Sequence, residues 1–193
     1  MDIHFLNRLF RPPDNFLKRG VGHCLLTFWL SFGLPIAQPV AMADDALEYQ
    51  VKAAFIYNFI VFTQWPDNTS ETIQLCVYGE DYFGHELDKL HNRSVGKRHI
   101  RVVRIQSAER LAQCQAIFFS KSVSNNLSST LVDLQDKSIL TLTDSPNAIS
   151  QGIVINMNVI NEKIVFEINL AAARKSGLDI SSKLLQLAVK VHQ

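Results

Sequence analysis

Charged residues are missing from one long stretch near the N-terminus: no Asp, Glu, Lys or Arg occurs between Arg19 and Asp44. Apolar residues crowd positions 24–34, two prolines follow, and the stretch ends in Ala41-Met42-Ala43. Four basic residues precede it, namely Arg8, Arg11, Lys18 and Arg19. This layout is typical of a secretory signal peptide cleaved after Ala43, which predicts a periplasmic protein. The alternative is an uncleaved membrane anchor, which the short apolar core disfavours because a spanning helix needs about 20 apolar residues.

Cysteine is scarce: of three in the chain, only Cys76 and Cys114 lie beyond Ala43. Two cysteines exclude a disulfide-dense scaffold, and their wide separation excludes a CxxC redox motif. In an oxidising compartment an even pair favours a structural disulfide; two buried thiols are the alternative. Cys76 lies on the first expected strand and Cys114 just ahead of the third, and these strands are neighbours in a flavodoxin-type order.

Neither sign of charge dominates. The chain has 19 Lys+Arg and 18 Asp+Glu, and without residues 1–43 its formal charge falls from +1 to about −1. Near-neutrality gives no electrostatic reason to expect nucleic acid as a partner. The 150 residues from 44 to 193 fit a single domain.

Motifs for catalysis and for metal binding are also missing. The segment 79–84 begins like a phosphate-binding loop, but His85-Glu86 stand where Lys-Ser/Thr is required. The third expected strand ends without the carboxylate that a receiver domain needs, the histidines have no metal-ligand spacing, and no Gly-x-Ser-x-Gly elbow occurs. We therefore expect no enzyme, no catalytic residue, no cofactor and no metal site.

Strands and helices alternate along the rest of the chain. Helices are expected at 47–63, 82–90, 108–114 and 127–134, and strands at 73–78, 100–105, 116–119 and 138–142. Two further strands, 153–159 and 164–170, flank Asn161-Glu162 as a β-hairpin, and a last helix at 181–191 has Asp179 or Ser181 as its cap. The pattern predicts a three-layer α/β fold, a flavodoxin/Rossmann-like, mainly parallel sheet with a C-terminal antiparallel hairpin. Residues 100–105 would form a sheet edge.

The first helix is apolar nearly all round, so it must be covered on more than one side. One face carries Val51, Ala54, Phe55, Val61, Phe62 and Trp65. The residues that spread over the other side form a candidate contact with a partner or a second copy of the chain: Tyr49, Ala53, Ile56, Tyr57, Phe59 and Ile60. The alternative is that the C-terminal helix covers them.

One cluster of basic residues occurs, comprising Arg93, Lys97, Arg98, Arg101 and Arg104. It is a candidate contact for an anionic ligand or an acidic partner surface. The alternative is a solvated loop and a sheet edge protected by charge against mispairing.

Five short motifs occur in order from Tyr49 to the C-terminus. They are Tyr49-Gln-Val-Lys-Ala-Ala-Phe-Ile-Tyr-Asn-Phe59 followed by Trp65-Pro66; Gly79 to Gly84; Leu140-Thr-Leu-Thr-Asp144; Phe166-Glu-Ile-Asn-Leu170; and Ser181-Ser-Lys-Leu-Leu185 with Leu187-Ala188. Together they resemble the YfiR-like periplasmic repressor family over essentially the whole mature chain.

The resemblance implies a small, non-catalytic periplasmic protein that restrains an inner-membrane diguanylate cyclase by contacting its periplasmic domain. It also implies control of cyclic di-GMP and biofilm, and an outer-membrane lipoprotein that sequesters the repressor. A homodimer is expected separately, from the second apolar face of the first helix. Cys76 and Cys114 match one disulfide of the family. The second pair of some members has no counterpart, since residues 141–158 contain no Cys. The alternative function is that of a periplasmic module that binds a small anionic molecule through the basic cluster.

Overall fold

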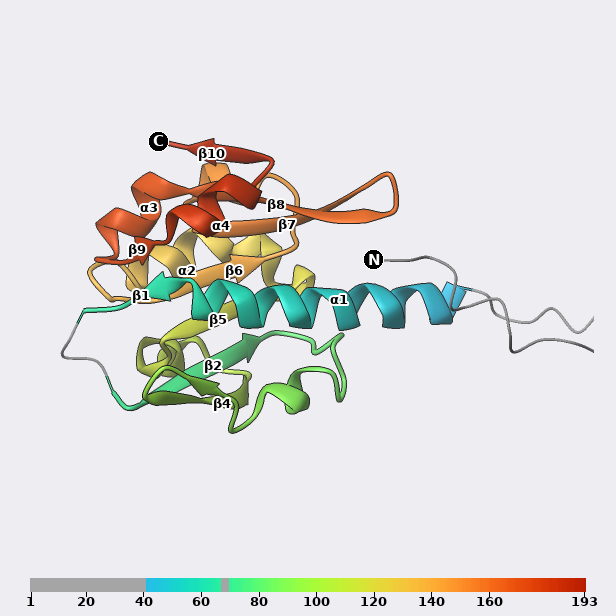
Figure 1. Ribbon diagram of the computed structural model, residues 1–193, viewed down its shortest axis with the longest axis horizontal. Helices are drawn as coiled ribbons and strands as arrows, with labels where there is room; N and C mark the ends of the chain where they lie inside the picture. The colour runs from blue at the N-terminus through green and yellow to red at the C-terminus, as the bar shows by residue number, and fades with distance from the viewer. Residues whose placement is uncertain (1–40, 67–69) are drawn as a thin grey trace, which may run out of the picture. The chain divides into compact units, whose positions relative to one another are not determined.

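An eight-stranded mixed sheet organises the part of the chain that the computed structural model describes, residues 41–66 and 70–193 (Figure 1). Its strands are β2 Thr72–Tyr78, β3 Ser94–Val95, β4 Arg98–Ile105, β5 Ala116–Phe119, β6 Leu140–Thr143, β7 Ile155–Ile160, β8 Lys163–Asn169 and β10 Lys190–His192. Their order is β10-β8-β7-β6-β5-β2-β4-β3. The five strands from β7 to β4 are parallel, whereas β8 and β3 pair antiparallel with β7 and β4. The predicted α/β class with a C-terminal hairpin is confirmed.

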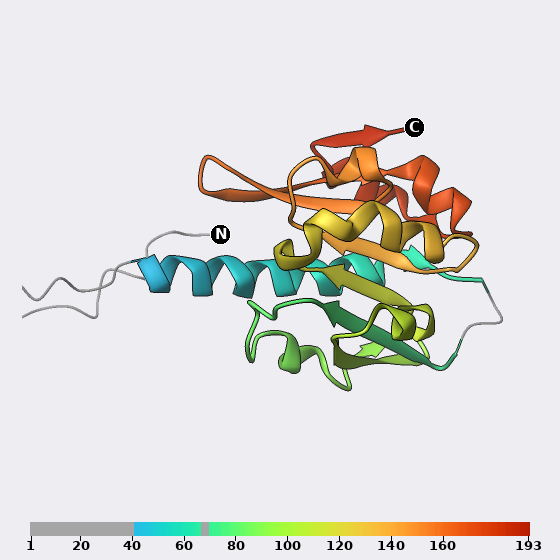
Figure 2. The same ribbon diagram turned by 180° about the vertical axis from the view of Figure 1, so that it is seen from behind.

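Helices cover both faces of this sheet. The helical segments are α1 Ala41–Val61, η2 Leu87–Leu90, η3 Ala108–Gln113, η4 Lys121–Asn126, α2 Leu127–Asp133, η5 Ala148–Gln151, α3 Leu170–Lys175 and α4 Ser182–Leu187, where η marks a 3₁₀ helix. Residues of α1, η2, α3 and α4 pack in one apolar cluster, and residues of η3, α2 and η5 pack in a second cluster. Figure 2 shows α2 on the side of the sheet opposite α1. The three predicted layers are therefore present.

α1 is the longest element, with 21 residues and neither Gly nor Pro among them. It ends where Thr63 turns into β1 (Thr63–Gln64), whose partner in a small separate sheet is β9 (Asp179–Ile180). The Thr63 hydroxyl donates a hydrogen bond of 2.7 Å to the Phe59 carbonyl and so satisfies part of the open helix end. The predicted signal peptide lies outside the described residues, except for residues 41–43 at the start of α1.

Two predicted helices are wrong in part. The expected helix 82–90 is reduced to η2, because Asp81 accepts a hydrogen bond from the Phe83 amide and Gly84 takes a positive φ of 53°. The expected helix 181–191 ends at Leu187, although its predicted cap is confirmed: the Ser181 hydroxyl accepts from the Lys183 amide. The chain then becomes β10, which pairs in parallel with β8 and completes the sheet. Backbone hydrogen bonding to β8 overrides the helical pattern of apolar residues there.

The prediction that residues 100–105 lie at an edge of the sheet agrees with most of β4. β3 pairs only with Arg98 and His99, so most of β4 has a strand partner on one side alone. The hairpin between β7 and β8 turns at Asn161 and Glu162, both at positive φ (49° and 61°), which matches the expected two-residue connection.

Candidate functional site at the carboxyl ends of the strands

Two of the sequence motifs meet inside the protein. Tyr49 and Lys52 lie one turn apart on α1, and Asp144 follows directly after β6. The Tyr49 hydroxyl donates a hydrogen bond of 2.9 Å to Asp144 Oδ2, and Lys52 Nζ forms an ion pair with the same oxygen. Lys52 also pairs with Glu48, one turn earlier on α1. We call Glu48, Tyr49, Lys52, Lys121 and Asp144 the carboxyl-end cluster.

Burial makes this cluster unusual. The side chains of Lys52 and Asp144 are each only 1% exposed, and charged groups are almost never buried to this extent unless they are paired. Lys121 lies 3.5 Å from Asp144 Oδ2 on the solvent side, with half of its side chain exposed. Two cations and two carboxylates therefore balance. Asp144 Oδ1 is buried and has no hydrogen-bond partner among the described residues.

Tyr49 connects the charges to a group of aromatic rings. Its ring lies 4.3 Å from Lys52 Nζ and packs edge-on against Phe83 at 5.0 Å between centroids. Burial raises the pKa of the Tyr49 phenol far above its ordinary value, and the neighbouring Asp144 carboxylate raises it further. The phenol therefore stays protonated and remains a hydrogen-bond donor.

A third motif, the segment 79–84, supplies the aromatic side of the site. Tyr82 and Phe83 both contact the Tyr49 ring. Gly79 leaves β2 at a φ of +97°, and a Cβ there would lie 2.6 Å from the Ser122 hydroxyl, so only glycine fits the turn. The absence of a side chain at Gly79 thus allows the turn after β2 to pack closely against the segment that follows β5.

The carboxyl-end cluster lies at the ends of the parallel strands, where open α/β sheets usually bind ligands. A surface cavity of about 520 Å³ adjoins it, lined by Asp45, Ala46, Glu48, Tyr49, Tyr82 and Lys121. The cluster itself is buried and joins α1 to the sheet. Lys52 and Asp144 balance each other's charge, so the cluster acts as a buried ion pair that holds α1 on the sheet.

The structure corrects the predicted contact face of α1. Tyr49, Ala53, Ile56, Phe59 and Ile60 are all less than 8% exposed and belong to the apolar core, so they are not available to a partner in this fold. Tyr57 alone of the six is half-buried, and Arg93 stacks on its ring at 3.9 Å.

The exposed side of α1 is instead the face that the sequence suggested as core. Val51 and Val61 on that face are 39% and 38% exposed, and Ala54 is exposed between them. Both faces are apolar, so periodicity alone did not identify which one faces the sheet.

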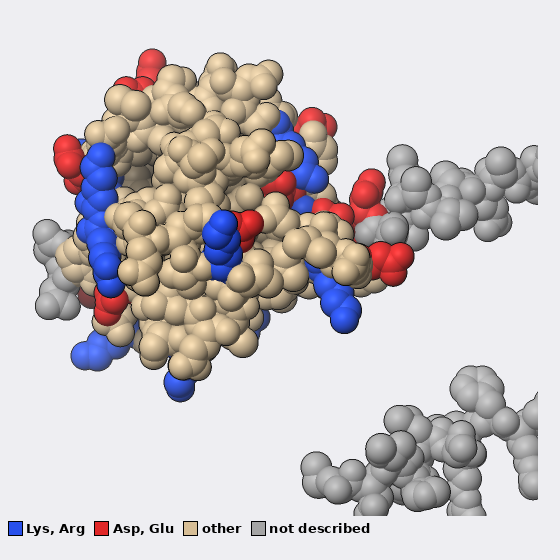
Figure 3. Space-filling view, turned by 90° about the horizontal axis from the view of Figure 1, so that it is seen from above, with Lys and Arg blue, Asp and Glu red and all other residues tan. Residues whose placement is uncertain are grey.

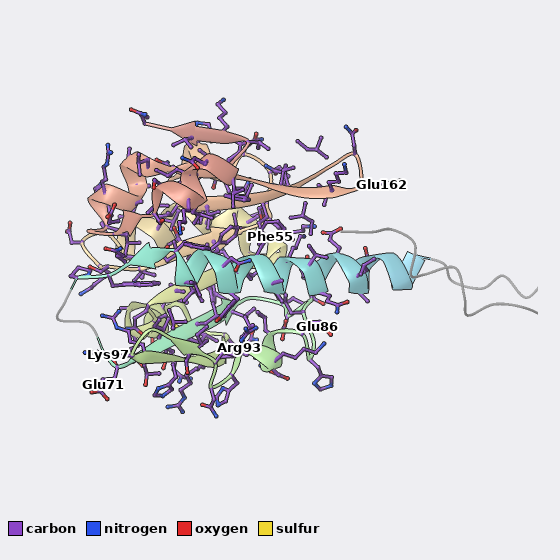
Figure 4. All side chains as sticks on the ribbon, viewed as in Figure 1. Phe55, Glu71, Glu86, Arg93, Lys97 and Glu162 are labelled. Carbon is purple, nitrogen blue, oxygen red and sulfur yellow. A yellow bond between two sulfur atoms is a disulfide. The ribbon has the colours of Figure 1, made fainter. Side chains whose placement is uncertain are left out.

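The predicted basic cluster is not brought together. Alternation along β4 turns Arg98 and Arg104 toward one side of the sheet and Arg101 toward the other. Arg104 is already occupied by Asp81 at 2.8 Å and by Asp88. Lys97 lies in the turn between β3 and β4, apart from Arg93 (Figure 4).

Charge is scattered elsewhere too. Figure 3, which looks onto the molecule from the side of β10, shows single acidic and basic side chains on a largely uncharged face. These arrangements favour the solvated alternative for the basic residues.

The expected disulfide is present between Cys76 on β2 and Cys114 just before β5, with 6.1 Å between the Cα atoms. Both residues are buried, and β2 pairs with β5 as predicted.

In residues 41–66 and 70–193 no group of three or more His, Cys, Asp or Glu side chains is placed to hold a metal ion. No helix in those ranges is long and apolar enough to span a membrane.

The fold and the site together define an α/β domain in which residues of two sequence motifs, Tyr49, Lys52 and Asp144, form a buried anchor. A model of the YfiR/HmsC-like family matches residues 49–189, and the chain belongs to this family. Family membership indicates a periplasmic regulator of diguanylate cyclase signalling. No curated protein matches the chain.

Two solved structures are similar in outline. One is a conserved domain protein from Vibrio cholerae O1 biovar El Tor, with 10% identity and a TM-score of 0.48. The other is the ABC domain in complex with L-Trp from Streptococcus pneumoniae, with 10% identity and a TM-score of 0.49. Each match covers 74% of this chain, and the chain spans 60% of the length of each of these structures.

Proposed function

We propose that this protein is a non-enzymatic periplasmic repressor that binds the periplasmic domain of an inner-membrane diguanylate cyclase. By restraining the cyclase it lowers cyclic di-GMP and biofilm formation. The observation that carries the proposal is the family match over residues 49–189. Export through the N-terminal signal peptide, a homodimer and an outer-membrane lipoprotein that sequesters the repressor belong to the same proposal.

The arrangement of the motif residues supports binding rather than turnover. Lys52 and Asp144 form an ion pair inside the protein and Tyr49 donates a hydrogen bond to the same carboxylate, so the three present no free nucleophile or base to a substrate. The dispersed basic residues give no support to an anion-binding module as a second function, because Arg98 and Arg101 lie on opposite sides of the sheet.

The decisive experiment measures cyclic di-GMP in cells that lack the gene and in cells that carry it on a plasmid. Loss of the gene is expected to raise cyclic di-GMP several-fold, and membranes from the same cells are expected to yield a cyclase when the exported protein is used as bait. Cells from which that cyclase is also deleted serve as the control and should show no rise. Unchanged cyclic di-GMP, together with no cyclase on the bait, would contradict the proposal.

A further inference from the structure

The strands at the C-terminal edge of the sheet present apolar side chains on one face and polar side chains on the other. On β7, Ile155 and Met157 belong to the apolar cluster that contains residues of α1, and Asn156 and Asn158 alternate with them. Glu167 on β8 is the register partner of Asn156, so its side chain lies on the same polar face. Figure 1 shows β10 beside β8 and β7 at this edge. Alternation therefore gathers amide and carboxylate groups on the face opposite α1.

A surface cavity of about 410 Å³ opens at this polar face. Four polar side chains line it, those of Asn156, Asn158, Glu167 and His192, and Pro146 and Ile149 add apolar surface. These residues come from β7, β8, β10 and the segment around η5, so elements far apart in the sequence meet there. The volume falls in the range of about 300–1,000 Å³ that is usual for the binding of small molecules.

A chain of hydrogen bonds with a fixed direction connects the four polar side chains. A carboxylate can only accept, so Glu167 accepts from Asn158 Nδ2 at 3.4 Å and from His192 Nε2 at 2.6 Å. Asn158 then directs its Oδ1 to Asn156 Nδ2, 3.3 Å away. Asn156 is only 3% exposed, and its Oδ1 is buried without a hydrogen-bond partner among the described residues. Such an acceptor destabilises a fold unless a molecule outside the chain donates to it.

The chemistry of the lining selects the class of that molecule. Among the described residues that line the cavity none is Lys or Arg, and Glu167 is the one carboxylate. Lys190, the register partner of Glu167 on β10, is exposed, and the Glu167 carboxylate contacts His192 instead. This lining offers no cation to a phosphate, to a carboxylate or to a zwitterionic amino acid. A primary ammonium group carries one positive charge, three hydrogen-bond donors and no acceptor, which matches an unpartnered amide oxygen beside a carboxylate.

We infer that this cavity binds a small aliphatic amine, whose ammonium group donates to Asn156 Oδ1 and to the Glu167 carboxylate. The methylene groups of the amine lie against Pro146 and Ile149. The bound amine satisfies the one amide oxygen that the hydrogen-bond chain leaves without a partner. The site is separate from the carboxyl-end cluster, and the inference is independent of cyclase binding.

A titration series with one carbon chain and three head groups tests the inference. Butylamine, butan-1-ol and butyrate are added in turn to ¹⁵N-labelled protein purified from the periplasm, and amide signals are followed by nuclear magnetic resonance. Butylamine is expected to shift the signals of Asn156, Asn158 and Glu167 saturably, with a Kd on the order of 1 mM. Butan-1-ol keeps a donor without the charge and should bind at least about tenfold more weakly, since hydrogen bonds between charged groups are the stronger ones. Butyrate reverses the charge and should not bind.

Three variants assign the binding to this cavity. Glu167→Gln keeps the shape of a side chain that is 27% exposed and should weaken butylamine binding about tenfold, because only the charge is removed. Lys190→Gln is the matched control of opposite sign and should strengthen binding a few-fold, since it removes a cation beside Glu167. Asn156→Leu removes the unpartnered acceptor and should abolish the saturable shift.

The outcomes separate this inference from the proposed function. A butylamine titration that moves no signal at the cavity up to tens of millimolar overturns the inference and leaves Asn156 Oδ1 to bound water. Equal affinities for butylamine and butan-1-ol also overturn it, because the cavity then selects a hydroxyl donor rather than a cation. Cyclase capture by the same variants is scored separately, so a failure to capture the cyclase contradicts the proposed function alone.

Discussion

Lys52 and Asp144, 92 residues apart in the sequence, form an ion pair inside the protein that joins α1 to the end of β6. The Tyr49 hydroxyl binds the same carboxylate oxygen. Because both charges are removed from water, each depends on the other for its solvation. The position of α1 on the sheet, and with it the face that α1 exposes, is therefore coupled to this pair.

Replacing Lys52 alone should be costly. In Lys52→Met the Asp144 carboxylate stays buried without a cation, so the free energy of unfolding should fall by about 3–5 kcal/mol in urea titrations. Lys89→Met is the matched control, since Lys89 pairs with Glu86 at the surface with 61% of its side chain exposed, and it should cost less than about 1 kcal/mol. The double variant Lys52→Met/Asp144→Leu should recover much of the loss. Equal costs for the two lysines would refute the buried anchor.

Removing one hydroxyl should have a smaller effect of the same origin. Tyr49→Phe keeps the ring that packs on Phe83 but deletes a hydrogen bond to a charged acceptor, which is worth about 1.5–3 kcal/mol. Tyr57→Phe is the control, because its hydroxyl makes only a long, 3.4 Å contact with the Ser94 carbonyl near the surface. Thermal melts of both variants should show a clear decrease for Tyr49→Phe alone. Similar melting temperatures would contradict the assigned hydrogen bond.

Much of the fold followed from the sequence because its strands are short apolar runs with turn residues between them. Strand 73–78 and the hairpin around Asn161 agree with the prediction to within about two residues, and the predicted disulfide joins Cys76 on β2 to Cys114 just before the neighbouring strand β5. In these cases local pattern and tertiary packing agree, which is the condition for prediction from sequence.

Other features of the fold are determined by tertiary contacts and could not be predicted from the local sequence. Both faces of α1 are apolar, so its pattern did not distinguish the core face with Ile56 from the exposed face with Val51. The segment 190–192 has a helical pattern but gains backbone hydrogen bonds by joining β8. Lys52 carries no signal in the sequence, because a lysine in a helix is usually solvated, and only its proximity to Asp144 in space reveals the pair.

The surface ion pair between Asp88 and Arg104 should make stability depend on acid pH. The hydrogen bond from Arg104 lowers the pKa of the Asp88 carboxyl below its ordinary value. A carboxyl whose pKa is lower in the folded state stabilises the protein above its unfolded pKa of about 3.9, and this contribution is lost as the pH falls through the lower folded value. Asp88→Asn should therefore melt at a lower temperature than wild type at pH 6, and the difference should shrink below about pH 4. A difference that stays constant down to pH 2 would show that Asp88 acts through packing instead.

The disulfide should stabilise the edge of the sheet that it encloses. Cys76 and Cys114 close a loop of 38 residues that contains β3, β4 and η3, and such a closure contributes about 3–4 kcal/mol in the chain-entropy model. Cys76→Ala/Cys114→Ala is the suitable variant, because serine hydroxyls at these buried positions would lack partners. Urea unfolding should show that dithiothreitol lowers wild-type stability to the level of this variant and leaves the variant itself unchanged. Hydrogen exchange of the variant should rise first in β3 and β4, since β4 has a strand partner on one side along most of its length. Two reactive thiols in denatured, unreduced protein, or a wild type insensitive to the reductant, would show that the bond does not form or does not stabilise this edge.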